Sequence, residues 1–338
     1  MAEGKVRWGV LGTAHIADAL VRAFKLAGNC ELTAVASRNL AVAQAWAAGR
    51  DVPNAFGNYE EMLASDAIDA VYTPVPNALH GEWSIKAMRQ GKHVLCEKPL
   101  GSSAAEVREM MAVAEATGVK LMEAFMYRFH PATARLVDLA TNGTIGTPKV
   151  IRATFGFLLA KPEDIRWSAE LAGGSLMDVG CYCVNVARLL AGAEPLAVTA
   201  SATWAATGVD ESLVGTLEFP GGLLATVDSS FSLGTAMQQT VTVSGTEGRL
   251  LVNQPFRRGD QPVDIVVDKA DSGDFASRKE TVQVPGAAQY ALMAEHFADA
   301  VLNNGPLAYS LQDSLGNMQV IEALLESART GRRVELLG

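Results

Sequence analysis

The chain has 338 residues, of which 49% are hydrophobic and 19% are charged, and its formal net charge is −9. Its length and apolar content suit two globular domains, and the acidic balance, without a stripe of Lys and Arg, argues against a nucleic-acid-binding surface. No stretch approaches the ~18 uninterrupted apolar residues of a membrane span, and the amino terminus lacks an apolar signal region. We therefore expect a cytoplasmic protein without membrane contact.

The four cysteines, Cys30, Cys96, Cys181 and Cys183, form no Cys-x-x-Cys pair and have no zinc-ligand spacing with the five histidines. We expect reduced, buried thiols and no metal site. A reactive role for Cys181 or Cys183, which flank a candidate catalytic residue, is the less favoured alternative.

Short apolar runs alternate with helical stretches from residue 5 to about residue 123. The predicted elements, in chain order, are strand 6–11, helix 14–26, strand 31–36, helix 40–48, strand 68–72, helix 78–89, strand 93–96, helix 104–117 and strand 120–124. Strict alternation of strands and helices predicts an α/β fold with a doubly wound parallel sheet.

The pattern changes to longer alternating strands after a helix predicted at 131–142. The predicted elements are then strand 148–157, helix 175–190, strands 195–205, 213–219, 223–231 and 238–244, and helices 289–303 and 311–330. Turns such as Pro220-Gly221-Gly222 favour hairpins and an antiparallel sheet. We place one domain at residues 1–124 and a second at residues 125–338.

A weakened dinucleotide-binding fingerprint follows the first predicted strand. Gly12 would permit the tight turn, Ala14 would stand where the backbone approaches a pyrophosphate, and Ala17 would stand where the helix packs on the strand. Two alanines replace glycines of the motif, so this segment is a weak signal by itself, and His15 is equally compatible with solvent. The candidate cofactor residues of the turn are Gly12, Thr13, Ala14, His15 and Ile16.

The second predicted strand ends without the acidic residue that usually binds the ribose 2′-hydroxyl of NAD. Ser37 and Arg38 stand there instead, and a hydroxyl with a guanidinium suits a 2′-phosphate. We therefore predict NADP as the cofactor in preference to NAD. The alternative is that Ser37 caps the next helix and Arg38 is solvated.

Lys98 follows the buried run Val94-Leu95-Cys96 and precedes Pro99, which has no N–H to continue a sheet. The lysine therefore lies at the carboxyl end of a strand, the edge of an α/β sheet at which ligands bind. A solvated lysine before a turn is the alternative. After the preceding strand, Asn77 either caps a helix or contacts the nicotinamide ribose.

Asp178, Tyr182 and Asn185 are spaced i, i+4 and i+7, so a helix places them on one face. If Lys98 meets Tyr182, the ammonium favours the phenolate and lowers a phenol pKa that is ordinarily about 10. Tyr182 then takes a proton from an alcohol while hydride leaves for the nicotinamide, and Asp178 holds a neighbouring hydroxyl. The alternative is a tyrosine hydroxyl satisfied by Asp178 in the interior.

Four motifs together resemble the Gfo/Idh/MocA family, named for glucose-fructose oxidoreductase and inositol dehydrogenase, over essentially the whole chain. They are Glu97-Lys98-Pro99, Pro76-Asn77-x-x-His80, the segment 174–182 and the segment 123–131. Tyr182, Ser37-Arg38 and the segment 164–167 look most similar to the NADP-dependent branch that contains D-xylose dehydrogenase and dimeric dihydrodiol dehydrogenase. Ala14 departs from the family fingerprint.

The resemblance implies a Rossmann NADP-binding domain and a substrate-binding α/β domain. The second domain would have a large, mostly antiparallel open sheet through which the chain forms a homodimer or homotetramer. It implies catalytic roles for Lys98 and Tyr182, and we count Asp178 as a third candidate catalytic residue. We expect Lys98, Tyr127, Asp178 and Tyr182 to face substrate, although packing explains Tyr127 equally well. Further residues expected near cofactor are Thr73, Pro74, Asn77, His80, Glu97, Lys98, Arg166 and Trp167.

The leading hypothesis is an NADP-dependent oxidoreductase that moves a hydride between the nicotinamide and the hydroxyl or carbonyl carbon of a sugar or cyclic polyol. A keto-sugar reductase, acting on free or nucleotide-linked sugars, would use the same residues in the opposite direction. The third hypothesis is a non-catalytic NADP-binding regulator. The presence of both Lys98 and Tyr182 argues against it, because sensing needs the cofactor site alone.

Overall fold

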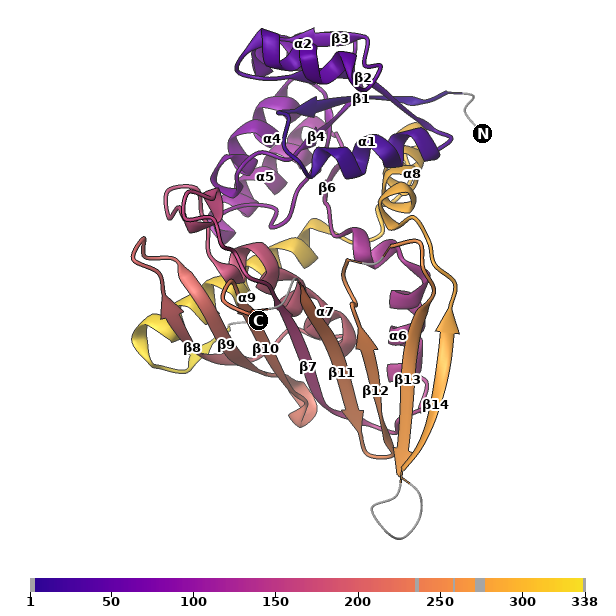
Figure 1. Cartoon of the computed structure of the whole chain (residues 1–338), viewed down its shortest axis with the longest axis vertical. Coiled ribbons are helices and arrows are strands. Elements are labelled where there is room, and N and C mark those ends of the chain that lie inside the picture. Colours follow the sequence, from indigo (N-terminus) through magenta and orange to yellow (C-terminus); the bar gives the residue numbers. More distant parts are fainter. Residues whose placement is uncertain (1–3, 235–236, 258, 271–276, 337–338) are drawn as a thin grey trace. The chain divides into compact units, whose positions relative to one another are not determined.

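The computed structural model describes residues 4–234, 237–257, 259–270 and 277–336. The chain packs into two compact units, Met1–Met126 with Ala288–Leu315, and Tyr127–Ala287 with Gly316–Gly338. Each unit is built around its own sheet (Figure 1).

The first unit contains a six-stranded parallel sheet in the order β3-β2-β1-β4-β5-β6, with helices between its strands. This arrangement confirms the predicted doubly wound fold. The strands are β1 (Val6–Leu11), β2 (Cys30–Ala36), β3 (Asn54–Phe56), β4 (Ala70–Thr73), β5 (His93–Cys96) and β6 (Leu121–Glu123). The helices are α1 (Ala17–Leu26), α2 (Leu40–Ala48), α3 (Tyr59–Ala64), α4 (His80–Arg89) and α5 (Ala104–Thr117).

Helix α1 begins at Ala17, three residues later than predicted, because the chain first makes a turn in which the Ala17 N–H donates to the Ala14 carbonyl. Similarly, a 3-10 turn over Asn77–Leu79 precedes α4. The sequence patterns missed β3 and α3, whose three and six residues are too few to display a period.

Helix α8 (Gln289–Leu302) belongs to the first unit although it follows the second sheet in the sequence. The Asn29 side chain donates to the Glu295 carbonyl at 2.9 Å, and the Trp8 and Phe297 rings lie 5.3 Å apart. The packing unit is therefore discontinuous, whereas the predicted division at residue 124 is continuous. The roles assigned to residues 1–124 and 125–338 stay predictions.

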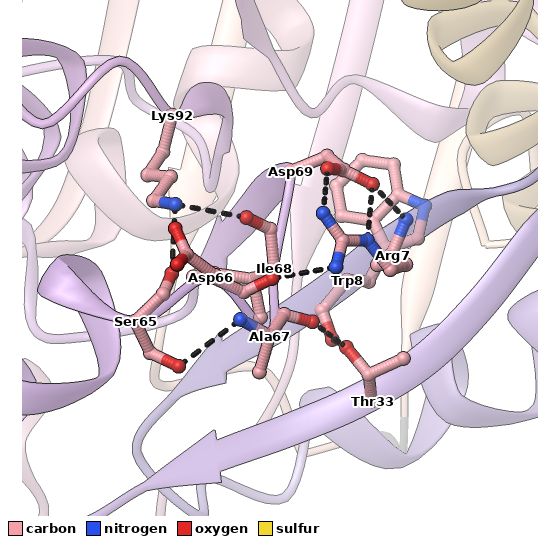
Figure 2. A network of polar contacts seen from close by, with 9 residues as sticks. All are labelled: Arg7, Trp8, Thr33, Ser65, Asp66, Ala67, Ile68, Asp69 and Lys92. Atoms are coloured by element: carbon pink, nitrogen blue, oxygen red, sulfur yellow. Dashed lines mark hydrogen bonds and ion pairs between the residues drawn. The ribbon is translucent and has the colours of Figure 1, made fainter.

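A polar network holds the connection between α3 and β4 at the amino ends of the strands (Figure 2). The Arg7 backbone N–H and Nε each donate to Asp69 Oδ2 at 2.9 Å, and Arg7 Nη2 donates to the other carboxylate oxygen. Lys92 Nζ donates to two backbone carbonyls of the segment 65–68 at 2.8 and 2.9 Å, and the Thr33 hydroxyl donates to a third at 2.7 Å. The loop's backbone acceptors are thus satisfied by side chains from neighbouring strands and loops.

The second unit contains a nine-stranded sheet in the order β14-β13-β12-β11-β7-β10-β9-β8-β15. Only the β7–β10 pair is parallel, which confirms the predicted mostly antiparallel sheet. Its strands are β7 (Pro148–Gly156), β8 (Ala197–Trp204), β9 (Asp210–Glu218), β10 (Leu224–Ser230), β11 (Gln238–Gly245), β12 (Gly248–Asn253), β13 (Val263–Ala270), β14 (Ser277–Val284) and β15 (Val334–Glu335). The last four were not predicted.

Helix α7 (Cys181–Ala191) packs against β7 and β10, and α6 (Pro131–Thr141) against the strands from β12 to β14. Strand residues alternate accordingly, with Ile151 and Ala153 buried while Arg152 is exposed. The remaining helix, α9, spans Leu311–Thr330. Among the described residues, no helix has the length and apolar character needed to cross a membrane.

Candidate active site

The carboxyl ends of the parallel strands bring several predicted site residues to one edge of the first sheet. Gly12, directly after β1, donates its N–H to the Ala36 carbonyl at the end of β2, at 2.8 Å. Ser37, after β2, donates to the Phe56 carbonyl at 3.1 Å, and Glu97, after β5, donates to the Thr73 carbonyl at 3.4 Å. This edge is where ligands bind in open α/β sheets.

The turn after β1 fits a dinucleotide. Gly12 has φ +90°, and a Cβ there would lie 3.2 Å from the Tyr59 hydroxyl, so glycine keeps both the conformation and the space. No side chain caps the start of α1 at Ile16, and the N–H groups of Ala17, Asp18 and Ala19 donate to the carbonyls of residues 14–16. Of the other predicted residues in the turn, Thr13 and Ala14 are half-buried and His15 is exposed.

Ser37 and Arg38 lie at the end of β2, and the structure argues against the capping alternative. Asn39 caps α2, since its Oδ1 accepts from the Ala41 N–H at 2.9 Å and from the Val42 N–H at 3.4 Å. Within the described part of the chain, the Ser37 hydroxyl makes no hydrogen bond and the exposed Arg38 makes no ion pair. A hydroxyl and a guanidinium are therefore available to an anion.

Glu97 is 8% exposed and holds the peptide that carries Lys98. Its Oε1 accepts from the Tyr72 hydroxyl at 2.5 Å, and its Oε2 accepts from the Lys98 N–H at 3.2 Å. Lys98 itself is half-buried and begins a cis peptide bond to Pro99. The carboxylate thus orients the lysine backbone directly after β5.

His80 is completely buried and connects two loops of the same edge. Its Nδ1 lies 2.7 Å from the Pro99 carbonyl oxygen and its Nε2 lies 2.9 Å from the Val75 carbonyl oxygen. Burial lowers the pKa of His80 to about 4, against the opposing effect of the two carbonyls, so the ring is neutral at pH 7. Thr73 and Pro74 are also buried, while Asn77 is half-buried.

The second unit places Asp178 and Tyr182 after a glycine turn. Gly174 has φ +109°, and a Cβ there would lie 2.1 Å from Asp210 Oδ1. Asp210 Oδ2 accepts from the Ser175 hydroxyl and from the Leu176 N–H, both at 2.7 Å. Asp210 was missed by sequence reasoning, because it lies at the start of β9, 32 residues beyond Asp178 and outside every motif.

The predicted helix at 175–190 begins as a π turn over Leu176–Gly180, and α7 follows it. Such turns are frequent at functional sites. Within it, Asp178 Oδ2 accepts from Arg166 Nε at 2.8 Å, and Asp164 Oδ1 accepts from the Arg166 N–H at 3.0 Å and from its Nη1 at 3.1 Å. The structure therefore joins two predicted site residues, Arg166 and Asp178, that the sequence did not pair.

Tyr182 is 5% exposed and lies in an aromatic cluster. Its ring centroid lies 6.0 Å from that of Tyr127, 5.5 Å from Phe155 and 5.4 Å from Phe256. The Tyr127 hydroxyl donates to Asn185 Oδ1 at 2.5 Å, which supports the packing explanation for Tyr127. Tyr182 and Asn185 thus contact the same residue, Tyr127, whereas Asp178 in the π turn pairs with Arg166.

Trp167 meets Phe231 edge to face, with centroids 5.2 Å apart, so it is anchored within the second unit. Lys98 lies in the first unit and Tyr182 in the second.

All four cysteines are free and buried, as predicted. Burial raises the pKa of Cys183 well above its ordinary value, which disfavours a reactive thiolate there. In the part of the chain that the structure describes, no group of three His, Cys, Asp or Glu side chains could hold a metal ion.

A parallel sheet with a glycine turn after β1, together with a second unit whose π turn and α7 carry Asp178 and the buried Tyr182, is the arrangement expected of an oxidoreductase with a Rossmann fold. The family model described as "Oxidoreductase family, NAD-binding Rossmann fold" matches residues 6–125, and that of the "GFO/IDH/MocA C-terminal domain" matches residues 133–251. The chain therefore belongs to the GFO/IDH/MocA oxidoreductase family, as its motifs predicted.

Relatives match most of the chain. A D-xylose 1-dehydrogenase (NADP(+)) from Haloferax volcanii is 40% identical over 334 residues, covering 97% of this chain and 99% of its own. A trans-1,2-dihydrobenzene-1,2-diol dehydrogenase from Sus scrofa is 36% identical and covers 74% of this chain and 75% of its own. A 3-ketoreductase from Actinomadura kijaniata, solved with NADP and TDP-benzene, has a TM-score of 0.89 at 30% identity and covers 96% and 98%.

Proposed function

We propose that this protein is an NADP-dependent oxidoreductase that moves a hydride between the nicotinamide and the hydroxyl or carbonyl carbon of a sugar or cyclic polyol. The observation that carries this proposal is the pair Ser37 and Arg38 after β2, where an acid would select NAD. Both side chains lack partners among the described residues, so both are available to a 2′-phosphate. The NADP-dependent D-xylose dehydrogenase and the ketoreductase with bound NADP support the same cofactor.

Tyr182 is the proposed acid–base residue and Lys98 the residue that tunes it. The ordinary phenol pKa of about 10 is too high for a base at neutral pH, and an adjacent ammonium would lower it. Tyr182 would take the hydroxyl proton of an alcohol, or return it to a carbonyl oxygen in reduction, and Lys98 would orient that oxygen. Bound NADP supplies the nicotinamide that accepts or donates the hydride.

The other site residues orient these two. Asp178, held by Arg166, would accept a hydrogen bond from a neighbouring substrate hydroxyl. Glu97 and His80 would act through the loops that carry Lys98 and Pro74, and Tyr127 would act through its contact with the Tyr182 ring. Because His80 is completely buried, we propose it as a positioning residue in place of a direct cofactor contact.

The test follows the absorbance of reduced nicotinamide with NADP⁺ and then NAD⁺ against aldoses, cyclic polyols and trans-dihydrodiols. Tyr182→Phe keeps the ring cluster and removes the acid–base group, so kcat should fall by about 10³-fold. Tyr290→Phe, the same chemical change in α8, is the matched control and should retain turnover. A Tyr182→Phe enzyme with wild-type kcat would contradict the proposed role.

Reduction of a keto sugar is the second candidate, favoured by the TM-score of 0.89 to a 3-ketoreductase. Solved variants of that ketoreductase replace a tyrosine with phenylalanine and a lysine with alanine, the residue types proposed here as the reacting pair. A screen of NADPH oxidation with free and nucleotide-linked keto sugars tests this direction. Activity there, without oxidation of any polyol, would favour it.

We also propose that the protein is cytoplasmic and forms a homodimer or homotetramer through the second sheet. Val214 in β9 is 60% exposed and Leu224 in β10 is 44% exposed, while their neighbours Leu213 and Ala225 are buried. Substituting Val214 and Leu224 with Lys should yield monomers by light scattering. A monomeric wild-type protein would contradict the proposed assembly.

A further inference from the structure

Tyr59, the first residue of α3, lies beside the end of β2 because the backbone holds it there. Ala36 pairs with Phe56 in the sheet, and the Ser37 N–H donates to the Phe56 carbonyl. Gly57 then lets the chain approach α2, since a Cβ at that position would lie 3.2 Å from the Leu40 Cβ. The turn between β3 and α3 therefore runs alongside the segment that contains Ser37.

The Tyr59 ring packs against the side chain of Trp83. It meets Trp83 of α4 edge to face, with centroids 4.7 Å apart and an interplanar angle of 86°. The Lys86 ammonium lies 4.0 Å from the centroid of the same Trp83 ring and pairs with Glu82 at 2.7 Å and with Glu60 at 3.1 Å. These contacts restrict the rotation of the phenol and fix where its hydroxyl points.

The Tyr59 hydroxyl lies beside Gly12, in the turn that follows β1. Its oxygen lies 3.2 Å from the position of a Cβ on Gly12, and it makes no hydrogen bond to another described residue. Burial raises the pKa of Tyr59 and the charge of Arg38 opposes that rise, so the net shift is upward and the phenol keeps its proton at neutral pH. The hydroxyl is therefore a neutral, oriented donor that lies beside Gly12 and within the field of Arg38.

We propose that Tyr59 is a cofactor-binding residue that donates its hydroxyl hydrogen bond to the 2′-phosphate of NADP, together with Ser37 and Arg38. The inference rests on the proposed NADP dependence and adds a third specificity residue to it. A phosphate monoester accepts several donors at once, so a guanidinium and two hydroxyls suit its oxygens. NADH has no such group, and Tyr59 should therefore discriminate between the two cofactors.

The test measures the equilibrium binding of NADPH and of NADH to the full chain. Quenching of tryptophan fluorescence reports the binding. Tyr59→Phe keeps the ring on Trp83 and removes the donor. We expect the Kd for NADPH to rise about tenfold, as for the loss of a hydrogen bond to a charged group, and the Kd for NADH to change less than about twofold. Tyr290→Phe is the matched control, and the Tm of each variant shows that it is folded.

The outcomes separate this inference from the proposed function. An unchanged NADPH Kd in Tyr59→Phe overturns the inference, and an equal loss for both cofactors also overturns it, because it would place the contact on the shared pyrophosphate. If Arg38→Ala reduces the preference for NADPH and Tyr59→Phe leaves it unchanged, NADP dependence stands and the role of Tyr59 falls. If the wild-type chain binds NADH as tightly as NADPH, both are wrong.

Discussion

The two ends of the parallel sheet in the first unit use polar side chains in opposite ways. At the amino ends of the strands, the loop before β4 is held by hydrogen bonds (Figure 2). Arg7 bonds to Asp69, and Lys92 donates to two backbone carbonyls of the segment 65–68. At the carboxyl ends, Ser37 and Arg38 have no such partners within the described ranges. The amino-end network thus stabilises the fold, whereas the carboxyl end combines hydrogen-bonded residues such as His80 and Glu97 with two side chains, Ser37 and Arg38, that are available for a ligand.

Backbone geometry explains which end does which. In alternating β–α units each helix begins at the carboxyl edge, so its unpaired N–H groups and positive dipole end are found there. Helices α2 and α3 are capped by Asn39 and Asn58, whereas α1 and α4 have no side-chain cap at their starts. Of these two helices, α1 follows the glycine turn at Gly12, where we expect the phosphates of a dinucleotide to bind.

A lysine-to-methionine change at each end should give the largest contrast. Lys98→Met removes the proposed tuning ammonium, and we expect kcat to fall by about 10³-fold while the Tm changes little. Lys92→Met removes two hydrogen bonds to backbone carbonyls, so it should lower stability by about 1–2 kcal/mol and leave kcat unchanged. Steady-state kinetics measures kcat, and urea unfolding measures stability. Equal losses of kcat in the two variants would contradict the proposed difference between the two ends of the sheet.

Gly174→Ala tests whether hydrogen bonds also hold polar groups in place in the second unit, where Asp210 accepts from Ser175 and Leu176. The new Cβ would lie 2.1 Å from Asp210 Oδ1 at a backbone φ of +109°, so we expect a loss of about 3 kcal/mol from overpacking and strain. Gly208 is the matched control, because its φ is +88° and no atom lies within 4 Å of its Cβ position. Gly208→Ala should cost about 1 kcal/mol. If urea unfolding shows similar losses of stability for the two variants, the Asp210 side chain can move away from the new Cβ at little cost.

Arg38→Ala sharpens the comparison for cofactor choice. Losing the guanidinium should raise the Michaelis constant for NADP about 30-fold and change that for NAD less than about twofold. Arg7→Ala makes the same substitution at the opposite end of the sheet, where it should change stability and neither Michaelis constant. Equal effects of Arg38→Ala on NADP and NAD would contradict the assignment of a 2′-phosphate site.

Asp69→Asn should have the smallest effect and a defined pH dependence. Burial raises the pKa of Asp69, but the hydrogen bonds and charge of Arg7 outweigh it, so the net shift is downward. A lowered folded-state pKa stabilises the fold above the unfolded value of about 3.9 and loses that contribution as pH falls through the folded value. Both side chains are more than a third solvent-exposed, and screening reduces the contribution to roughly 0.5–1 kcal/mol.

Urea unfolding of the wild type and Asp69→Asn at pH 7 and at pH 3 checks this expectation. The variant should be less stable at pH 7, and the difference should shrink at pH 3. A difference that stays constant with pH would show that the carboxylate charge is not what stabilises this loop.

Much of the candidate site could be proposed from the sequence because its signals are local. Gly12 follows a run of apolar residues, Pro99 stops a strand, and Ser37-Arg38 stands where an acid is usual, so each can be recognised within a few residues. Tyr59 and Asp210 could not be predicted in this way. Tyr59 lies on a six-residue helix without a period, and Asp210 reaches Ser175 across 35 residues of chain.

The sequence by itself determined the parallel sheet, the mostly antiparallel second sheet and the strand ends at which Gly12, Ser37 and Lys98 stand. The hydrophobic period and the turn-forming residues act between neighbours in the chain, so both can be recognised in the sequence alone. Only the tertiary structure decided that α8 returns to the first unit, that Arg166 holds Asp178 and that His80 is buried between two loops. Those outcomes depend on packing and hydrogen bonding between segments distant in sequence, which no local pattern records.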